Sequence, residues 1–178
     1  MSFQIHTPRF VLRDFELSDI AHYTAQCQDK KYQRFYSDED CSIEKCDELV
    51  KIFIAQAKIS QRNAYHLAIT DRVTGEYLGI AGLRLENENQ ASVGCGLVRN
   101  KQHKHVAHEA MKALLEFGFQ QLQIHRAYAE TISDNIAAVK LCKSIGMRQE
   151  AELIQNRYFK NQWWNTTILA ILSSEFPR

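Results

Sequence analysis

Three apolar runs in close succession constrain the fold of this chain most. They span residues 65–70, 77–85 and 91–98, and only the turn at 71–75 and the polar stretch at 86–90 separate them. Two short turns between three strand-like runs predict an antiparallel meander. A segment with helical periodicity follows at once, and its apolar stripe comprises Val106, Ala110, Met111, Leu114, Leu115 and Phe119.

The remaining segments complete a mixed α/β pattern. Ser42 precedes one periodic segment as an N-cap, and Gly146 follows another in the usual C-cap position. The order β-α-α-β-β-β-α-β-α-β-β predicts a mostly antiparallel mixed sheet with helices on both faces, in one domain over residues 1–178. Further strands are expected at 10–15, 127–132, 148–159 and 163–172, and further helices at 16–27, 42–57 and 135–145.

Composition argues against several functional classes. The formal net charge is +1 and the isoelectric point about 7.7, so no overall basic field attracts nucleic acid. The apolar run at 168–172 is too short to span a bilayer, and charged residues interrupt the first twenty positions. Five cysteines without a Cys-x-x-Cys pair indicate free thiols and a cytoplasmic location. We expect no nucleic-acid partner and no membrane partner.

The loop between the meander and the periodic helix has the character of a phosphate site. A strand that leads into a helix N-terminus leaves backbone N–H groups free, and the helix dipole favours an anion there. Arg99, Lys101 and Lys104 add positive charge. His103, His105 and His108 also stand in this segment, but no carboxylate or cysteine with ligand spacing accompanies them, so we expect no metal.

Several motifs in this order resemble the GNAT acyltransferase superfamily. The closest resemblance is to the branch that acetylates N-terminal amines of ribosomal proteins. The segment 7–13 with Asp19 is similar to that branch's first strand and helix start, and 134–147 is similar to its asparagine-initiated helix. The segment 157–167 is similar to its C-terminal hairpin.

The resemblance implies acetyl-CoA as co-substrate, bound in an opening between the fourth and fifth strands. It assigns the pantetheine contact to the backbone of Leu97 and Val98, and gives Asn135 either a capping role or a contact with pantetheine or substrate. It places the pyrophosphate on the segment that comprises Gln102, His103, Lys104, His105, Val106, Ala107 and His108.

This chain departs from the family pattern at several positions. His105 replaces a glycine, and a positive φ would strain a histidine there; its ring either adds charge to the phosphates or occupies their site. Asn135 and Cys142 are the candidate catalytic residues. Cys142 replaces a tyrosine and either donates a proton or packs in the core. His66 and Glu130 are further candidates for a base that acts through water.

The resemblance implies an N-acetyltransferase that moves an acetyl group to a primary amine, on a protein N-terminus or a small molecule. The alternative is a catalytically degenerate domain that senses CoA or binds a protein partner. The protein is expected to be a monomer or homodimer. The acceptor groove would use residues from the N-terminal helices and the last hairpin: Tyr32, Phe35, Tyr36, Asp38, Glu39, Asp40, Tyr158, Phe159, Trp163 and Trp164.

Overall fold

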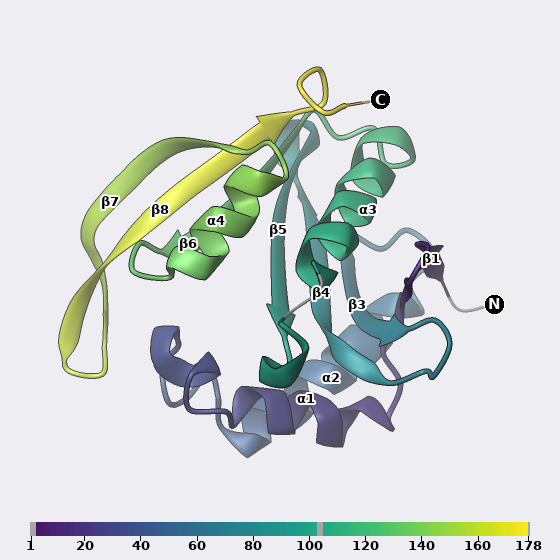
Figure 1. Cartoon of the computed structure of the whole chain (residues 1–178), viewed down its shortest axis with the longest axis horizontal. Helices are drawn as coiled ribbons and strands as arrows, with labels where there is room; N and C mark the ends of the chain where they lie inside the picture. The colour runs from purple at the N-terminus through teal and green to yellow at the C-terminus, as the bar shows by residue number, and fades with distance from the viewer. Residues whose placement is uncertain (1–2, 103–104, 178) are drawn as a thin grey trace.

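A mixed sheet forms the centre of the molecule in the computed structural model, which describes residues 3–102 and 105–177 (Figure 1). Within this part the sheet has eight strands in the order β1-β2-β3-β4-β5-β6-β8-β7. Neighbouring strands are antiparallel except for the parallel pair β5–β6. The strands are β1 (Gln4–His6), β2 (Phe10–Asp14), β3 (Ala64–Asp71), β4 (Tyr77–Glu86), β5 (Gln90–Leu97), β6 (Arg126–Ile132), β7 (Arg148–Phe159) and β8 (Gln162–Leu172).

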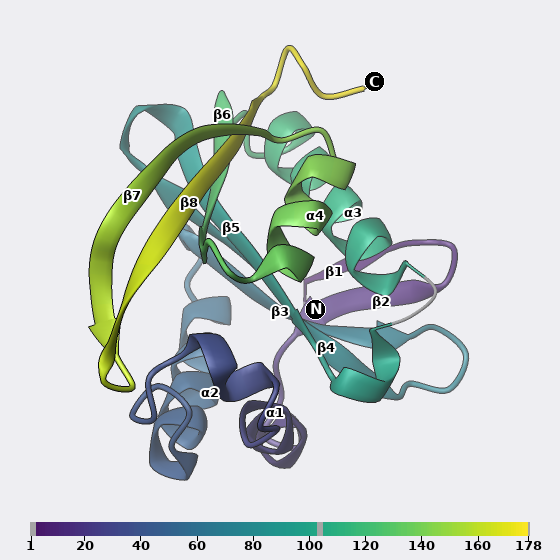
Figure 2. The same ribbon diagram turned by 60° about the vertical axis from the view of Figure 1, so that its left-hand side comes forward.

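Helices cover both faces of the sheet, as the sequence predicts (Figures 1 and 2). One face packs against α3 (Val106–Gln120) and α4 (Ile136–Ser144), with Leu114 and Leu115 fully buried in the larger core cluster. The opposite face packs against α1 (Asp19–Cys27) and α2 (Ile43–Ala57) around a smaller cluster. That cluster comprises Phe15, Tyr23, Cys27, Cys46, Val50, Phe53, Ala68 and Tyr77.

The local predictions are largely confirmed. The β3–β4–β5 meander is antiparallel, and Ser42 accepts a hydrogen bond from the Lys45 N–H as the N-cap of α2. Gly146 follows α4 with φ +93°, a value that favours glycine. The sequence did not predict β1, which has only three residues and so no usable periodicity. It also did not predict the short 3₁₀ helices η1 (Tyr32–Phe35), η2 (Asn87–Asn89) and η3 (Arg99–Lys101).

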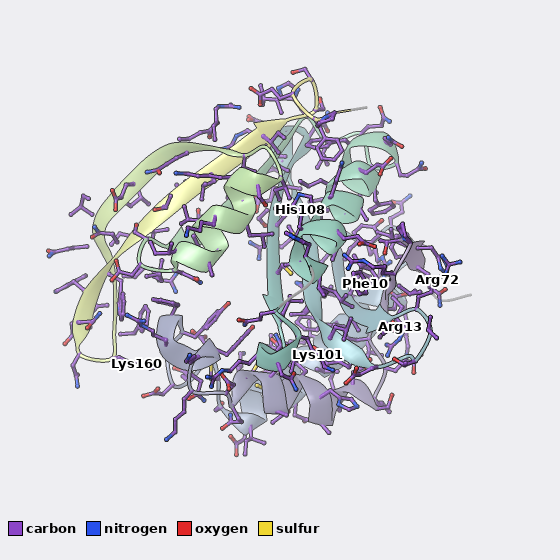
Figure 3. All side chains as sticks on the ribbon, viewed as in Figure 1. Phe10, Arg13, Arg72, Lys101, His108 and Lys160 are labelled. Carbon is purple, nitrogen blue, oxygen red and sulfur yellow. The ribbon has the colours of Figure 1, made fainter. Side chains whose placement is uncertain are left out.

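The last hairpin reaches back to the N-terminal half of the chain. Its two-residue turn consists of Lys160 and Asn161, both with positive φ, which suits a tight β-hairpin. The Lys160 ammonium donates a hydrogen bond to the Gln33 carbonyl at 2.6 Å and lies 3.5 Å from an Asp38 carboxylate oxygen (Figure 3). These contacts join the turn of the last hairpin to η1 and to the segment that follows it.

Candidate active site

The sheet opens between β5 and β6. These strands pair only at 90–92 with 126–128 and then diverge (Figure 2). The Val98 N–H donates to the Leu78 carbonyl, so these two residues form a hydrogen-bonded pair between β5 and β4. In an antiparallel pair of strands, every second residue bonds to the neighbouring strand in this way. By this alternation Val93, Cys95 and Leu97 direct their backbone N–H and carbonyl groups away from β4, towards the gap. Beyond residue 92, β5 therefore has an edge that β6 does not pair.

A cleft of about 350 Å³ lies along this edge. It brings together four residues that the sequence assigned to the cofactor: Leu97, Gln102, Ala107 and Asn135. Its lining consists of Lys31, Tyr32, Phe35, Tyr36, Cys95, Gly96, Leu97, Gln102, Ala107, Asn135, Ala137, Ala138 and Leu141. The cleft thus joins β5, α4, η1 and the start of α3, which are far apart in the sequence.

The start of α3 provides free backbone donors. His105 is the N-cap, and its side chain makes no capping hydrogen bond to the helix. Its backbone has φ +57° and ψ +30°, the left-handed conformation that glycine adopts easily and other residues adopt at a cost. The His105 side chain is exposed. The predicted residues His103 and Lys104 lie outside the described residues.

The other predicted phosphate and pantetheine residues differ in their surroundings. Val106 is buried in the core, so only its backbone can contribute, whereas His108 is half-buried near the start of α3. Val98 donates its N–H to Leu78 and accepts from the Lys101 N–H at 2.8 Å. Both backbone groups of Val98 are therefore already used, and the free edge belongs to Cys95 and Leu97 instead.

Asn135 and Cys142 occupy different environments on α4. The Asn135 Oδ1 accepts a hydrogen bond from the Ala138 N–H at 3.3 Å and caps the helix, while the residue also lines the cleft. Cys142 is 7% exposed and belongs to the larger core cluster. Burial raises the pKa of its thiol to about 11. The structure brings Asn135 to the cleft but leaves Cys142 behind the cleft wall.

A second cavity of about 320 Å³ lies on the α1–α2 face of the sheet. It shares Tyr32, Tyr36, Cys95 and Gly96 with the cleft, so the two spaces meet at β5. A Cβ at Gly96 would lie 2.9 Å from both the Gln26 Nε2 and the Tyr32 hydroxyl, so a larger residue at this meeting point would require these two side-chain ends to move. We call this space the acceptor-side cavity.

His66 lies in the acceptor-side cavity as a neutral imidazole. Burial, together with the positive charge of Arg84, lowers its pKa to about 4. Its Nδ1 lies 3.1 Å from the Gln56 Oε1, and its ring stacks on Phe53 with centroids 4.2 Å apart. Because a carboxamide oxygen only accepts, the proton is assigned to Nδ1 and the lone pair to Nε2.

The aromatic residues expected in the acceptor groove divide into two groups. Tyr32, Phe35 and Tyr36 of the η1 region line the cleft, and Trp164 packs edge-on against Phe35. Tyr158 and Trp163 are mostly exposed. Asp40 and the candidate base Glu130 line a small cavity that adjoins the cleft through Phe35, Tyr36 and Asn135.

Several lining residues escaped the sequence analysis, namely Gly82, Arg84, Gly94 and Gly96. Glycines at alternate positions of an apolar strand were the available signal, because alternate residues face the same side of a sheet.

Comparisons with known proteins agree with this geometry. A sequence model of the Acetyltransferase (GNAT) domain matches residues 9–148. The chain belongs to the GNAT acetyltransferase family. It is 28% identical over 179 residues to the uncharacterized N-acetyltransferase YnaD of Bacillus subtilis, covering 97% of this chain and 98% of that protein. Together these matches make this protein an acetyltransferase.

Solved structures of GNAT enzymes share the fold. A Bacillus anthracis GNAT acetyltransferase superposes with a TM-score of 0.84 at 21% identity, covering 97% of this chain and all of the other. The Vibrio cholerae spermidine N-acetyltransferase, solved with CoA and spermine, superposes with a TM-score of 0.81 at 17% identity, covering 95% and 98%.

The described residues provide no sign of two other kinds of site. None of the helices in 3–102 and 105–177 combines the length and the apolar character that crossing a membrane requires. Across the same ranges, histidine, cysteine and acidic side chains form no group of three or more suited to a metal ion.

Proposed function

We propose that this protein transfers an acetyl group from acetyl-CoA to a primary amine, with the thioester at the point where the two cavities meet. The unpaired edge of β5 is the observation that carries the proposal. An extended ligand with amide groups, such as pantetheine, adds to an open strand edge as a further strand would. The backbone groups of Cys95 and the Leu97 N–H are available for it, whereas the Leu97 carbonyl already accepts a long hydrogen bond from Gln102.

The pyrophosphate would bind at the start of α3. Val106, Ala107 and His108 form the first turn of this helix, and the His105 side chain makes no capping hydrogen bond to their N–H groups. Gln102 lies between β5 and α3, and its Nε2 approaches the Leu97 carbonyl at 3.5 Å. We extend the same assignment to His103 and Lys104, which continue this loop in the sequence.

The amine would enter from the acceptor-side cavity and attack the thioester from the side opposite to the cofactor. Holding the two reactants in line can lower the barrier by about 7–11 kcal/mol without a dedicated acid. Asn135 orients the cofactor amides from the cleft wall. The free Nε2 of His66 takes the amine proton through water, because the ring stays neutral near pH 7; the C–S bond of the thioester then breaks, and the departing CoA thiolate takes a proton from water.

Cofactor binding tests the proposal directly. Acetyl-CoA at 100 times its Kd should stabilise the protein by about 2.7 kcal/mol, which thermal melting detects. Release of free thiol with a panel of primary amines then measures transfer. Absence of saturable binding in calorimetry at millimolar acetyl-CoA would refute the proposal. Binding without thiol release for any amine would instead favour the CoA-sensing alternative.

A further inference from the structure

The floor of the acceptor-side cavity is made of glycines. Gly82 on β4 pairs with Gly94 on β5, and Gly96 lies two residues further along the same face. A Cβ at Gly94 would have no other atom within 4 Å, so the space above this residue is open. At Gly82 a Cβ would lie 3.3 Å from the His66 Cδ2. The sheet is therefore bare above Gly94, where a ligand can lie directly on the backbone, whereas the His66 ring covers Gly82 and the ends of Gln26 and Tyr32 cover Gly96.

Flat rings form the walls above this floor. Tyr32 and Tyr36 stack with centroids 5.1 Å apart and an interplanar angle of 10°. Phe53 and His66 stack at 4.2 Å and 19°. Burial raises the pKa of Tyr32 well above its usual value, so its hydroxyl stays uncharged. Two stacked pairs beside a glycine floor suit a planar apolar body.

The charge of the cavity is unusual for a site that would accept a polycation. Among its lining residues, all of which the structure describes, Arg84 alone carries a permanent charge. The Arg84 side chain is 63% exposed and forms an ion pair with Glu86 at 3.6 Å, a contact too long for a hydrogen bond. The acids Asp40 and Glu130 line a third cavity of about 120 Å³, which shares Tyr36 with the acceptor-side cavity. None of the residues that line the acceptor-side cavity itself is acidic.

Arg84 and the meeting point with the cofactor cleft lie at opposite ends of the cavity. Arg84 pairs with Ser92 in the register of β4 and β5, and Ser92 is four residues from Gly96. Four residues of a strand span roughly 13 Å. The length of the arginine side chain shortens this distance. An acceptor whose amine lies at the meeting point and whose anion contacts Arg84 must still carry the two groups far apart.

We propose that the acceptor is a primary amine with an aromatic body and an anionic group at the far end, and that Arg84 binds this anion. The inference rests on the proposed function and adds the chemical class of its acceptor. Arg84 is then a specificity residue that selects against polyamines and in favour of anionic aromatic amines.

Two probes that differ only in charge test this assignment: 4-(2-aminoethyl)benzoic acid and 4-methylphenethylamine, with spermidine as a polycation. We expect wild-type kcat/KM to be about tenfold higher for the carboxylate, the effect of one partly exposed charge-assisted hydrogen bond. Arg84→Gln should abolish this preference. Lys58→Gln, an exposed residue beside α2 that does not line the cavity, should retain it.

A second variant tests the location of the body. Gly94→Val fills the open space over the floor and should reduce turnover of both aromatic probes at least tenfold, with acetyl-CoA affinity unchanged in calorimetry. Preference for spermidine, or equal preference for the two aromatic probes in wild type and Arg84→Gln, would overturn the inference while the acetyl transfer stands. Failure to bind acetyl-CoA at all would instead refute the proposed function.

Discussion

Replacing His105 by glycine separates the contribution of its backbone from that of its ring. His105 has φ +57° and ψ +30°, and a non-glycine residue in this region is less stable by about 1–2 kcal/mol. Glycine removes this strain but adds about 0.5–1 kcal/mol of chain entropy to the unfolded state. The expected net stabilisation is about 0.5–1 kcal/mol, or a rise of roughly 1–4 °C in Tm for a chain of this length.

Glu88 is a closely matched control. It is exposed, lies in η2 with φ 58° and ψ 34°, and does not line any of the cavities described above. Glu88→Gly should raise Tm by a similar amount and leave the Kd for acetyl-CoA unchanged. A rise for Glu88→Gly without one for His105→Gly would refute the left-handed conformation at His105.

The same variant tests whether the His105 ring contributes to acetyl-CoA binding. Because the backbone already has a glycine-like conformation, the substitution leaves the α3 donors in place and removes only an exposed imidazole. If the ring donates to the phosphates, calorimetry should show about a threefold to tenfold weaker Kd for His105→Gly, as for one exposed hydrogen bond to a charged group. Tighter binding would refute this role and show that the ring obstructs the phosphates.

Further variants test the sheet, the buried histidine and α4. Gly79→Ala would place a Cβ 2.2 Å from the Gly96 carbonyl oxygen, so we expect a loss of about 3 kcal/mol in chemical denaturation, whereas Gly94→Ala should change stability by less than about 1 kcal/mol. His66 has a pKa of about 4 when folded and about 6.5 when unfolded, so the unfolded chain binds more protons between these values. Stability should therefore fall by up to about 3 kcal/mol as the pH drops from 6.5 to 4, and urea melts of His66→Phe should show a smaller drop. Asn135→Ala should cost about 1 kcal/mol as a lost N-cap; Asn135→Ser should recover that stability, but not acetyl-CoA affinity if the amide binds the cofactor. Cys142→Ala should retain turnover in the thiol-release assay if the thiol only packs, and a loss of 100-fold or more would assign it the proton-donor role.

Local patterns in the sequence determined most of the secondary structure. The α3 stripe from Val106 to Phe119 and the meander at 65–98 both arise from periodicity that a single face of an element imposes. Caps at Ser42 and Gly146 depend on neighbouring residues only. The three-residue β1 and η1–η3 carry no comparable signal, because elements this short depend on contacts from elsewhere.

The candidate site shows the same division. The segment 99–108 and Asn135 are recognisable from the sequence because helix starts have local signatures. The free edge of β5 is not recognisable from the sequence, because it depends on how many residues of β6 pair with β5. β6 lies beyond α3 in the chain. The backbone use of Val98 is likewise decided by Leu78 on another strand.

The sequence by itself determined the order of the longer helices and strands, the amphipathic faces, the resemblance to the family and the loop that leads into α3. Tertiary structure alone decided that glycines from β4 and β5 line one cavity, that Arg84 is the charged residue in its lining, and that Cys142 is buried in the core. The physical reason is that periodicity and caps follow from residues a few positions apart. A cavity, by contrast, requires that distant residues leave the same space unfilled.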